Sequence, residues 1–163
     1  MNTLIIYASL HGCAKKCAFL VTNLLEGNYK LINLKKEYEV DFSKYKNIII
    51  GGSIHTGHIN PCIKDFCKKH ENELVKKNIG VYLCFMDPVE KGDYYISSSF
   101  SQKFVNHIKI KGYFGGEFDF DKMTFFEKLF VQKTTKINQS ISKIDPKKIQ
   151  NFCLKMNALI SSN

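Results

Sequence analysis

The sequence predicts an α/β fold in which helices cover both faces of a parallel sheet. Short apolar runs rich in β-branched and aromatic residues alternate with amphipathic stretches along the chain. The first apolar run passes through a short polar loop straight into an amphipathic stretch. Strands that alternate with helices form right-handed βαβ units, so we expect the strands to be parallel and buried on both faces.

The expected elements follow this alternation. The crossover at 35–44 mixes lysines and acids with little helical periodicity, so we expect it to be irregular. Pro61 and Pro146 mark first helical turns, where proline is favoured, with Asp145 as an N-cap. The serines at 97–99 are predicted to cap the helix that follows them. We expect strands at 3–8, 29–34, 45–50, 79–85 and 111–116, and helices at 17–25, 61–77, about 100–108 and from 146 onward.

The chain length favours a single domain over residues 1–163. With 44% hydrophobic residues, 163 residues can form one well-buried core and are too few for two ordinary domains. The longest apolar runs are far shorter than the ~20 residues of a membrane span. The first strand begins within three residues of Met1, which leaves no room for a signal peptide. We therefore expect a cytoplasmic protein that can contact the inner face of the membrane peripherally.

The loop from Ser9 to Lys15 is a candidate phosphate site. A short polar loop between a strand and a helix directs several backbone N–H groups, and the positive end of the helix dipole, at one place. An ordinary turn with an incidental Gly12 is the alternative. Ligands of parallel sheets bind beyond the carboxyl ends of the strands. Three strand ends carry polar or glycine-bearing loops, at 9–14, 53–58 and 85–92.

Cysteine and histidine spacing predicts no metal site. None of the six cysteines forms a CxxC pair, and they are expected to be reduced thiols. Cys13 and Cys17 are one helical turn apart, but no His or Cys nearby in the sequence completes a set of metal ligands with them. His11, His55 and His58 lack a fourth ligand. These histidines could instead tune the electronic properties of a bound ring or accept a proton from a substrate. Exposed loop residues without such a role are an equal alternative.

The positive charge favours anionic partners. The formal net charge is +9, and all 24 basic residues are lysines. Residues 103–163 hold eleven lysines against five acidic residues and so carry most of the excess. Such a field attracts anionic lipids, carboxylated small molecules or nucleic acid, although compositional bias could explain much of it. Because arginine is absent, bidentate base recognition is not available, and nucleic acid is not an expected partner.

The three loops together resemble those of the flavodoxin superfamily. Within it, the sequence is most similar to the menaquinone-dependent protoporphyrinogen IX dehydrogenases. Their G-[AG]-S-I-x-x-G-H segment corresponds to Gly51–His58, and their F-x-K-K-H segment to Phe66–His70. Their insertion after the fifth strand corresponds to about 118–143. The resemblance implies a doubly wound, three-layer sandwich with a five-stranded parallel sheet in the order 2-1-3-4-5 and a helical insertion after strand five.

The resemblance also implies an FMN-dependent oxidoreductase of porphyrin biosynthesis. Electrons would pass from a reduced porphyrinogen through FMN to a quinone or a redox protein. Alternatives are an electron-transfer flavodoxin without its own substrate and a cofactor-free binding domain. No catalytic acid or base is assigned. The implied FMN contacts are Ser9, Leu10, His11, Gly12, Cys13 and Ala14, then Ser53, Ile54, His55, Thr56, Gly57 and His58, and finally Phe85, Met86 and Asp87.

This chain departs from the family pattern at two loops. His11, Cys13 and Ala14 replace residues that usually offer hydroxyls to the phosphate, so we expect weakened but retained affinity. Thr56 stands where relatives often have a tyrosine that stacks on the flavin. Tyr94, Tyr95 or Phe85 could cover the ring instead.

The insertion contains a stretch of helical periodicity at 122–137. Met123, Phe126, Phe130 and Ile137 form one apolar stripe, which we predict packs on the core. Phe125 and Leu129 are then left on a face with Lys122, Lys133 and Lys136. Apolar residues among lysines suit an anionic membrane surface or a porphyrinogen carrying carboxylates.

Overall fold

The structure, a computed structural model, describes residues 2–162 and confirms the predicted sheet. Five strands lie parallel in the spatial order β2-β1-β3-β5-β6. When these five parallel strands are numbered one to five along the chain, their spatial order is 2-1-3-4-5, as predicted. The strands are β1 (Thr3–Ala8), β2 (Tyr29–Asn33), β3 (Asn47–His55), β5 (Asn78–Cys84) and β6 (Ile108–Tyr113).

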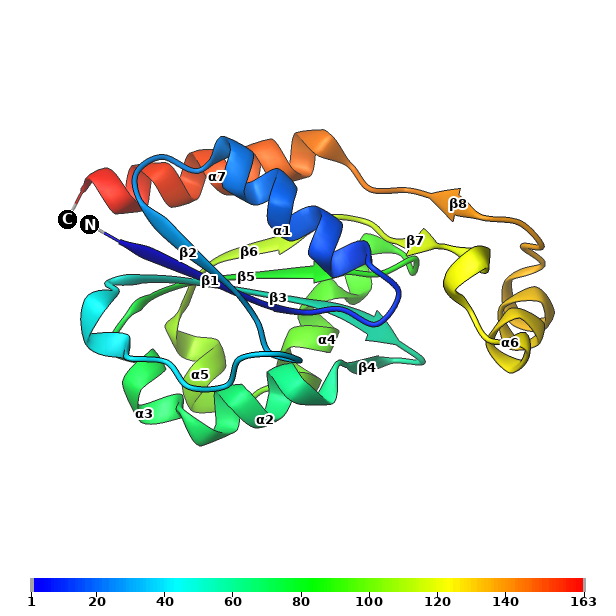
Figure 1. The fold of residues 1–163 in the computed structure, drawn as a ribbon, viewed down its shortest axis with the longest axis horizontal. Helices are drawn as coiled ribbons and strands as arrows, with labels where there is room; N and C mark the ends of the chain where they lie inside the picture. The colour runs from blue at the N-terminus through cyan, green and yellow to red at the C-terminus, as the bar shows by residue number, and fades with distance from the viewer. Residues whose placement is uncertain (1, 163) are drawn as a thin grey trace.

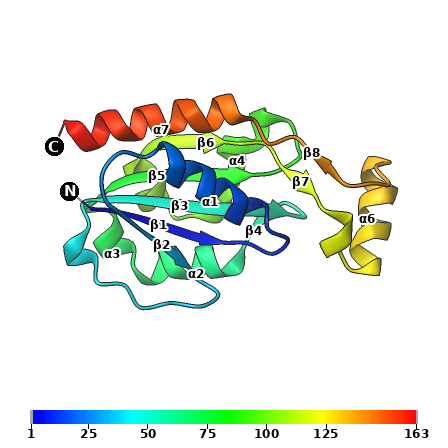
Figure 2. The same cartoon turned by 45° about the horizontal axis from the view of Figure 1, so that its top comes forward.

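Helices cover both faces of this sheet (Figures 1 and 2). One face carries α1 (Cys13–Leu24) and α7 (Pro146–Ser161). The other face carries α2 (Pro61–Lys69), α3 (Glu71–Leu74), α4 (Gly92–Ser99) and α5 (Gln102–His107). Alternate residues of β1 face the two layers, as a strand's period of two requires: Leu4 and Ile6 pack on the α2 side, Ile5 and Tyr7 on the α1 side.

The predicted helix starts at Pro61 and at Asp145-Pro146 are confirmed. Asn60 caps α2 by accepting a hydrogen bond from the Cys62 N–H, with Pro61 at the first helical position. Asp145 caps α7 by accepting from the N–H of Lys147, and Pro146 follows it. The crossover at 35–44 is irregular, as predicted, and contains only the short 3₁₀ turn η1 (Phe42–Lys44).

Several predicted boundaries were wrong because tertiary contacts override local signals. The helix expected at 61–77 is broken at His70, whose ring packs against Phe42 and Phe66 at centroid distances of 5.2 and 4.8 Å. The serines at 97–99 end α4, and Ser101 caps α5 by accepting from the Phe104 N–H. The fifth strand is β6 (Ile108–Tyr113), not 111–116, because Gly115, at φ 79°, turns the chain.

The insertion projects beyond one end of the sheet (Figures 1 and 2). It comprises β7 (Glu117–Phe118), η3 (Phe120–Lys122), α6 (Phe125–Thr135) and β8 (Ile141–Ser142), and β7 pairs with β8 antiparallel. The predicted packing of its Phe126 and Phe130 stripe on the core was wrong, since Phe126 is 80% exposed. Within α6 only Val131 is buried, because the helix lies beside the sheet's end and not over its face.

No helix within residues 2–162 is both long and apolar enough to cross a membrane.

A glycine in β3 accommodates the largest fully buried side chain. A Cβ on Gly51 would lie 1.9 Å from Cζ of Tyr82, on the neighbouring strand β5. The Tyr82 ring cannot move aside, because it stacks on Phe114 at 4.9 Å and its hydroxyl donates to the Ala14 carbonyl at 2.9 Å. Gly52, one residue on, faces Ile59, whose Cγ1 would lie 3.1 Å from an added Cβ.

Gly51→Ala should therefore destabilise the fold more than Gly52→Ala. Overpacking costs about 1–3 kcal/mol, and the Gly51 substitution should reach or exceed the upper end because its neighbour is fixed. Urea unfolding of the two variants measures this difference in the free energy of unfolding. An equal or larger loss in Gly52→Ala would contradict the assigned packing.

Candidate functional site

Three loops meet at the carboxyl ends of β1, β3 and β5. They are the turn from Ser9 to Gly12, the hairpin between β3 and β4 (His58–Ile59), and the segment from Phe85 through η2 (Val89–Lys91). The insertion lies at the same end of the sheet (Figures 1 and 2). This is the edge at which ligands of doubly wound sheets bind.

The first loop leaves the start of α1 open to an anion. Gly12 is the N-cap residue and adopts φ 101°, a left-handed conformation that favours glycine. No side chain caps α1. The amides of Cys13, Ala14 and Lys15 belong to the first turn, where N–H groups have no acceptor within the helix. The helix therefore begins with several donors and its positive dipole end available to one ligand.

Ser9 organises this loop from within. Its hydroxyl oxygen accepts the Gly12 N–H at 3.0 Å. Leu10 is half exposed, whereas Cys13 and Ala14 are buried beneath the loop. Because residues 11, 13 and 14 carry no hydroxyl, backbone N–H groups are the main hydrogen-bond donors that this part of the loop offers.

His11 connects the first loop to the insertion. Its Nδ1 lies 3.1 Å from the Lys122 carbonyl oxygen, and its Nε2 lies 3.0 Å from Oε1 of Glu127. Both partners are acceptors, so both hydrogen bonds form together only when the ring carries two protons. The Thr124 N–H and hydroxyl donate to Glu127, and with His11 they lower the pKa of this carboxyl.

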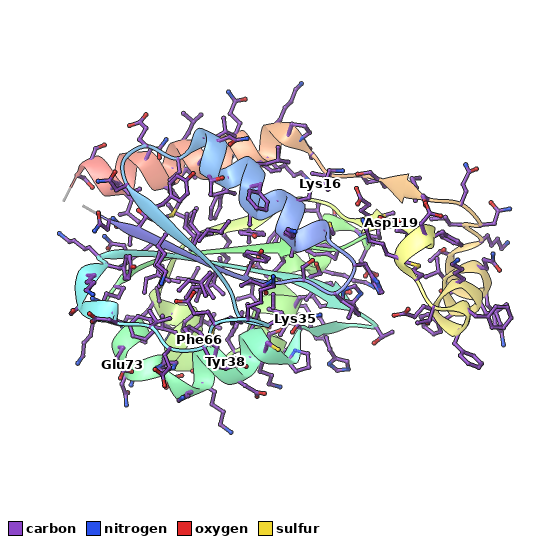
Figure 3. All side chains as sticks on the ribbon, viewed as in Figure 1. Lys16, Lys35, Tyr38, Phe66, Glu73 and Asp119 are labelled. Atoms are coloured by element: carbon purple, nitrogen blue, oxygen red, sulfur yellow. The ribbon has the colours of Figure 1, made fainter. Side chains whose placement is uncertain are left out.

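Two lysines strengthen this connection. Lys16 of α1 pairs with Oε2 of Glu117 at 2.8 Å. Lys122 pairs with Asp119, and its Nζ lies 3.5 Å from where a Cβ on Gly12 would be. Figure 3 labels Lys16 on α1 and Asp119 in the insertion, both at this end of the molecule. The insertion thus places a cationic side chain directly beside the Gly12 turn.

The second loop is a tight hairpin, so the prediction of a loop over all of 53–58 was wrong. Strand β3 continues to His55, and Ser53 and Ile54 are buried within it. Thr56 and Gly57 form the turn at φ 49° and 83°. Two successive positive φ angles are typical of a tight type I′ hairpin turn, which favours Gly57 but is unfavourable for the β-branched Thr56. His58 and Thr56 are exposed at the tip.

His55 faces the first loop from this hairpin. Its ring meets the His11 ring edge to face at a centroid distance of 5.5 Å. Burial lowers the pKa of His55 from its ordinary 6.5, and the charge of His11 lowers it further. Its buried Nε2 has no hydrogen-bond partner within residues 2–162. His55 therefore brings to this end of the sheet one buried ring nitrogen that makes no hydrogen bond within residues 2–162.

Part of the third loop packs into the hydrophobic core. Phe85 is buried and packs edge to face on Tyr95 at 5.2 Å, so neither ring is free to cover a ligand. Tyr94 is 64% exposed and is the one of the three aromatic candidates that remains accessible. Asp87 accepts from Lys91 and from the Tyr95 hydroxyl, and these contacts lower its pKa. Met86, between Phe85 and Asp87, is half-buried.

Gly116, which the sequence analysis did not single out, allows the insertion to begin here. A Cβ on it would lie 2.6 Å from the Phe85 carbonyl carbon. The neighbouring Gly115 carbonyl accepts the Phe85 N–H at 2.9 Å. The Gly115-Gly116 pair at the end of the predicted strand 111–116 was the available signal, because glycine in a strand often marks close backbone approach.

The expectation that no third residue joins Cys13 and Cys17 was wrong. Cys84, at the end of β5, brings its Sγ to within 4.8 Å of theirs, and all three side chains are buried. Hydrogen bonds from Cys17 and Cys84 lower the pKa of the Cys13 thiol, whereas the pKa values of its two partners are raised. Within residues 2–162, these three cysteines are the only group of side chains whose potential metal-ligand atoms lie this close together. His11, His55 and His58 do not form such a group.

Lowering the pH should destabilise the fold through His55. Its folded-state pKa lies below 6.5, so the unfolded chain binds a proton more readily than the folded chain. As the pH falls through about 6.5 towards the folded-state pKa, the free energy of unfolding should decrease. Urea unfolding at several pH values measures this slope. His55→Gln should reduce this slope without abolishing it, because burial also lowers the pKa of His70. The exposed His58→Gln should leave the slope unchanged, and equal slopes in all three proteins would refute the assignment.

Comparisons with known proteins agree with this geometry. The model of a family described as a flavodoxin domain matches residues 4–145. None of the curated proteins matches the sequence. A flavodoxin from Streptococcus pneumoniae TIGR4 shares 15% identity at a TM-score of 0.57, covering 98% of this chain and 99% of that one.

Two further solved structures share the fold. A Fusobacterium nucleatum flavodoxin bound to flavin mononucleotide has a TM-score of 0.59 and 15% identity, over 97% of this chain and 98% of that one. Rubredoxin oxygen:oxidoreductase from Desulfovibrio gigas has a TM-score of 0.63 and 10% identity, over 99% of this chain but 36% of that one. At these identities the similarity shows the fold. The family match names no narrower type within the flavodoxin domain.

Proposed function

Because the chain belongs to the flavodoxin domain family, whose members bind FMN, we propose that it binds FMN where β1, β3 and β5 end. The uncapped start of α1 is the observation that carries this proposal. It offers the amides of Cys13, Ala14 and Lys15 beside a cationic Lys122. A phosphate monoester matches this set of donors in charge.

The other two loops would hold the flavin ring. His55 contributes a buried nitrogen without a partner, and the hairpin tip at Thr56 and Gly57 is exposed beside it. Tyr94 is the accessible aromatic side chain of the third loop. Bound FMN accepts electrons as a hydride or singly and releases them to an acceptor. The residues of this chain bind the phosphate, orient the ring and set the charge around it.

FMN affinity should depend on the backbone conformation of Gly12. Gly12→Ala forces a side chain into the left-handed region, at about 1–3 kcal/mol, and places it beside Lys122. We expect FMN to bind about tenfold more weakly or worse, measured by quenching of flavin fluorescence.

Gly27→Ala is the matched control for this substitution. Gly27 also has a positive φ, 82°, but lies between α1 and β2, at the opposite end of the sheet. It should lower stability while leaving FMN affinity unchanged. Riboflavin, which lacks the phosphate, should bind the wild-type protein more weakly than FMN. Equal affinities would place the anchoring elsewhere, and no FMN binding at all would favour the cofactor-free domain.

We further propose an oxidoreductase that takes electrons from an apolar substrate, as the protoporphyrinogen dehydrogenases do. The exposed aromatic face of α6 supports this function. Phe125, Phe126, Leu129 and Phe130 are all about half exposed or more, and Lys128 and Lys133 lie on the same helix. An apolar face among lysines suits a carboxylated tetrapyrrole or an anionic membrane that holds a quinone.

The alternative is an electron carrier without a substrate of its own, which family membership supports equally well. Anaerobic protoporphyrinogen oxidation with a soluble quinone separates the two. Repeated turnover supports the enzyme, whereas an FMN-loaded protein that catalyses no turnover supports the carrier. The charge of +9 predicts an acidic redox partner for a carrier.

The α6 face should direct the protein to anionic membranes. The double variant Phe126→Ser, Phe130→Ser should bind phosphatidylglycerol-containing vesicles much more weakly than wild type in flotation assays, since both rings are exposed. Leu154→Ser removes a similarly exposed apolar residue from α7 and should bind like wild type. If the wild-type protein does not float with vesicles, membrane contact through 122–137 is wrong.

A further inference from the structure

Three buried thiols lie together beneath the first loop. Cys13 occupies the first position of α1, Cys17 the next turn of the same helix, and Cys84 the last position of β5. Their sulfur atoms lie within 4.8 Å of one another. Cys13 is 7% exposed, and the other two are 1% exposed or less. The cluster is therefore closed to bulk solvent and faces the α1 layer of the core.

The surrounding scaffold holds the three sulfurs in place. Tyr82, two residues before Cys84, donates its hydroxyl hydrogen to the carbonyl of Ala14, next to Cys13. This bond fixes the end of β5 against the first turn of α1. The remaining buried cysteines are not clustered: Cys67 lies in α2 on the other face of the sheet, and Cys153 donates to the Val21 carbonyl.

The number and type of donors favour one class of metal ion. Structural zinc takes four ligands in proteins, and within residues 2–162 no fourth His, Cys or carboxylate joins the trio. Soft thiolate ligands favour Cu(I). A monovalent ion is also less costly than a divalent one to bring into an apolar layer. We propose that Cys13, Cys17 and Cys84 bind one Cu(I) ion.

The start of α1 supports a thiolate at Cys13. Cys13 stands at the positive end of the α1 dipole, which stabilises negative charge in the first turn. Lys16 extends from the same helix, although its ammonium group is paired with Glu117. On binding, three S–Cu bonds form, and the protons of those sulfurs that were still thiols pass to solvent; no electron is transferred.

This site is separate from the proposed FMN site. The phosphate would contact the backbone amides of the first turn, whereas the ion would lie among side chains below it. The two sites share Cys13 through different atoms. Copper binding can therefore be measured on the apoprotein without FMN, and its outcome is independent of the flavin proposal.

The test is an anaerobic competition for Cu(I) against the coloured chelator bicinchoninate. The wild-type protein should remove one equivalent of copper from the chelator. Cys17→Ser and Cys84→Ser should each weaken Cu(I) binding by about 100-fold or more, since even outer-shell changes cost 10–100-fold. Cys67→Ser and Cys153→Ser remove equally buried thiols outside the cluster and should compete like wild type.

Circular dichroism melts identify any variant that has lost its fold. X-ray absorption of the copper-loaded wild-type protein should show three sulfur neighbours, a result that does not depend on any variant. Failure of folded wild-type protein to compete with bicinchoninate would overturn the proposal. Binding that persists in folded Cys84→Ser, or is lost equally in Cys67→Ser, would also overturn it.

Discussion

The position of the Tyr82 side chain is the constraint on which the functional end of the molecule depends. Its ring fills the space left by Gly51 and stacks on Phe114, and its hydroxyl bonds to the Ala14 carbonyl. One side chain therefore joins β3, β5, the segment after β6 and the first turn of α1. Because these contacts are buried and close-packed, the start of α1 cannot shift relative to the strand ends. Both the proposed phosphate donors and the thiol cluster require this placement.

The insertion changes which groups at this end are available to a ligand. His11 and Lys16 of the first loop and α1 are each paired with an acid of the insertion, Glu127 and Glu117 respectively. Lys122 lies beside Gly12 but is paired with Asp119. Since each of these side chains is already paired with an acidic residue, the unpaired backbone amides of α1 are the main hydrogen-bond donors left for an anion. A loop that lacks the usual hydroxyls can therefore still suit a phosphate.

Helical periodicity identified α6 but not what surrounds it. The spacing of Phe126 and Phe130 correctly indicates an apolar stripe, yet a stripe is buried only where another layer lies beside it. The β7-β8 ribbon places α6 beyond the end of the sheet, so these rings remain exposed. Val131 is the one buried residue of α6. The same limit applies at His70, where ring contacts with Phe42 and Phe66 interrupt a helix that the sequence pattern continues.

The strand order was implied by the resemblance of the three loops to those of the flavodoxin superfamily. By itself, the sequence determined the parallel sheet, the strand-loop-helix turn after the first strand, and the helix starts at Pro61 and at Asp145-Pro146. These features follow from backbone periodicity and from residues adjacent in the chain, so local patterns are sufficient to predict them. Only the tertiary structure decided that Cys84 joins Cys13 and Cys17, that His11 pairs with Glu127, and that β3 continues into a hairpin. Such contacts depend on strand register and on how the insertion folds back, and residues distant in sequence carry no local signal of either.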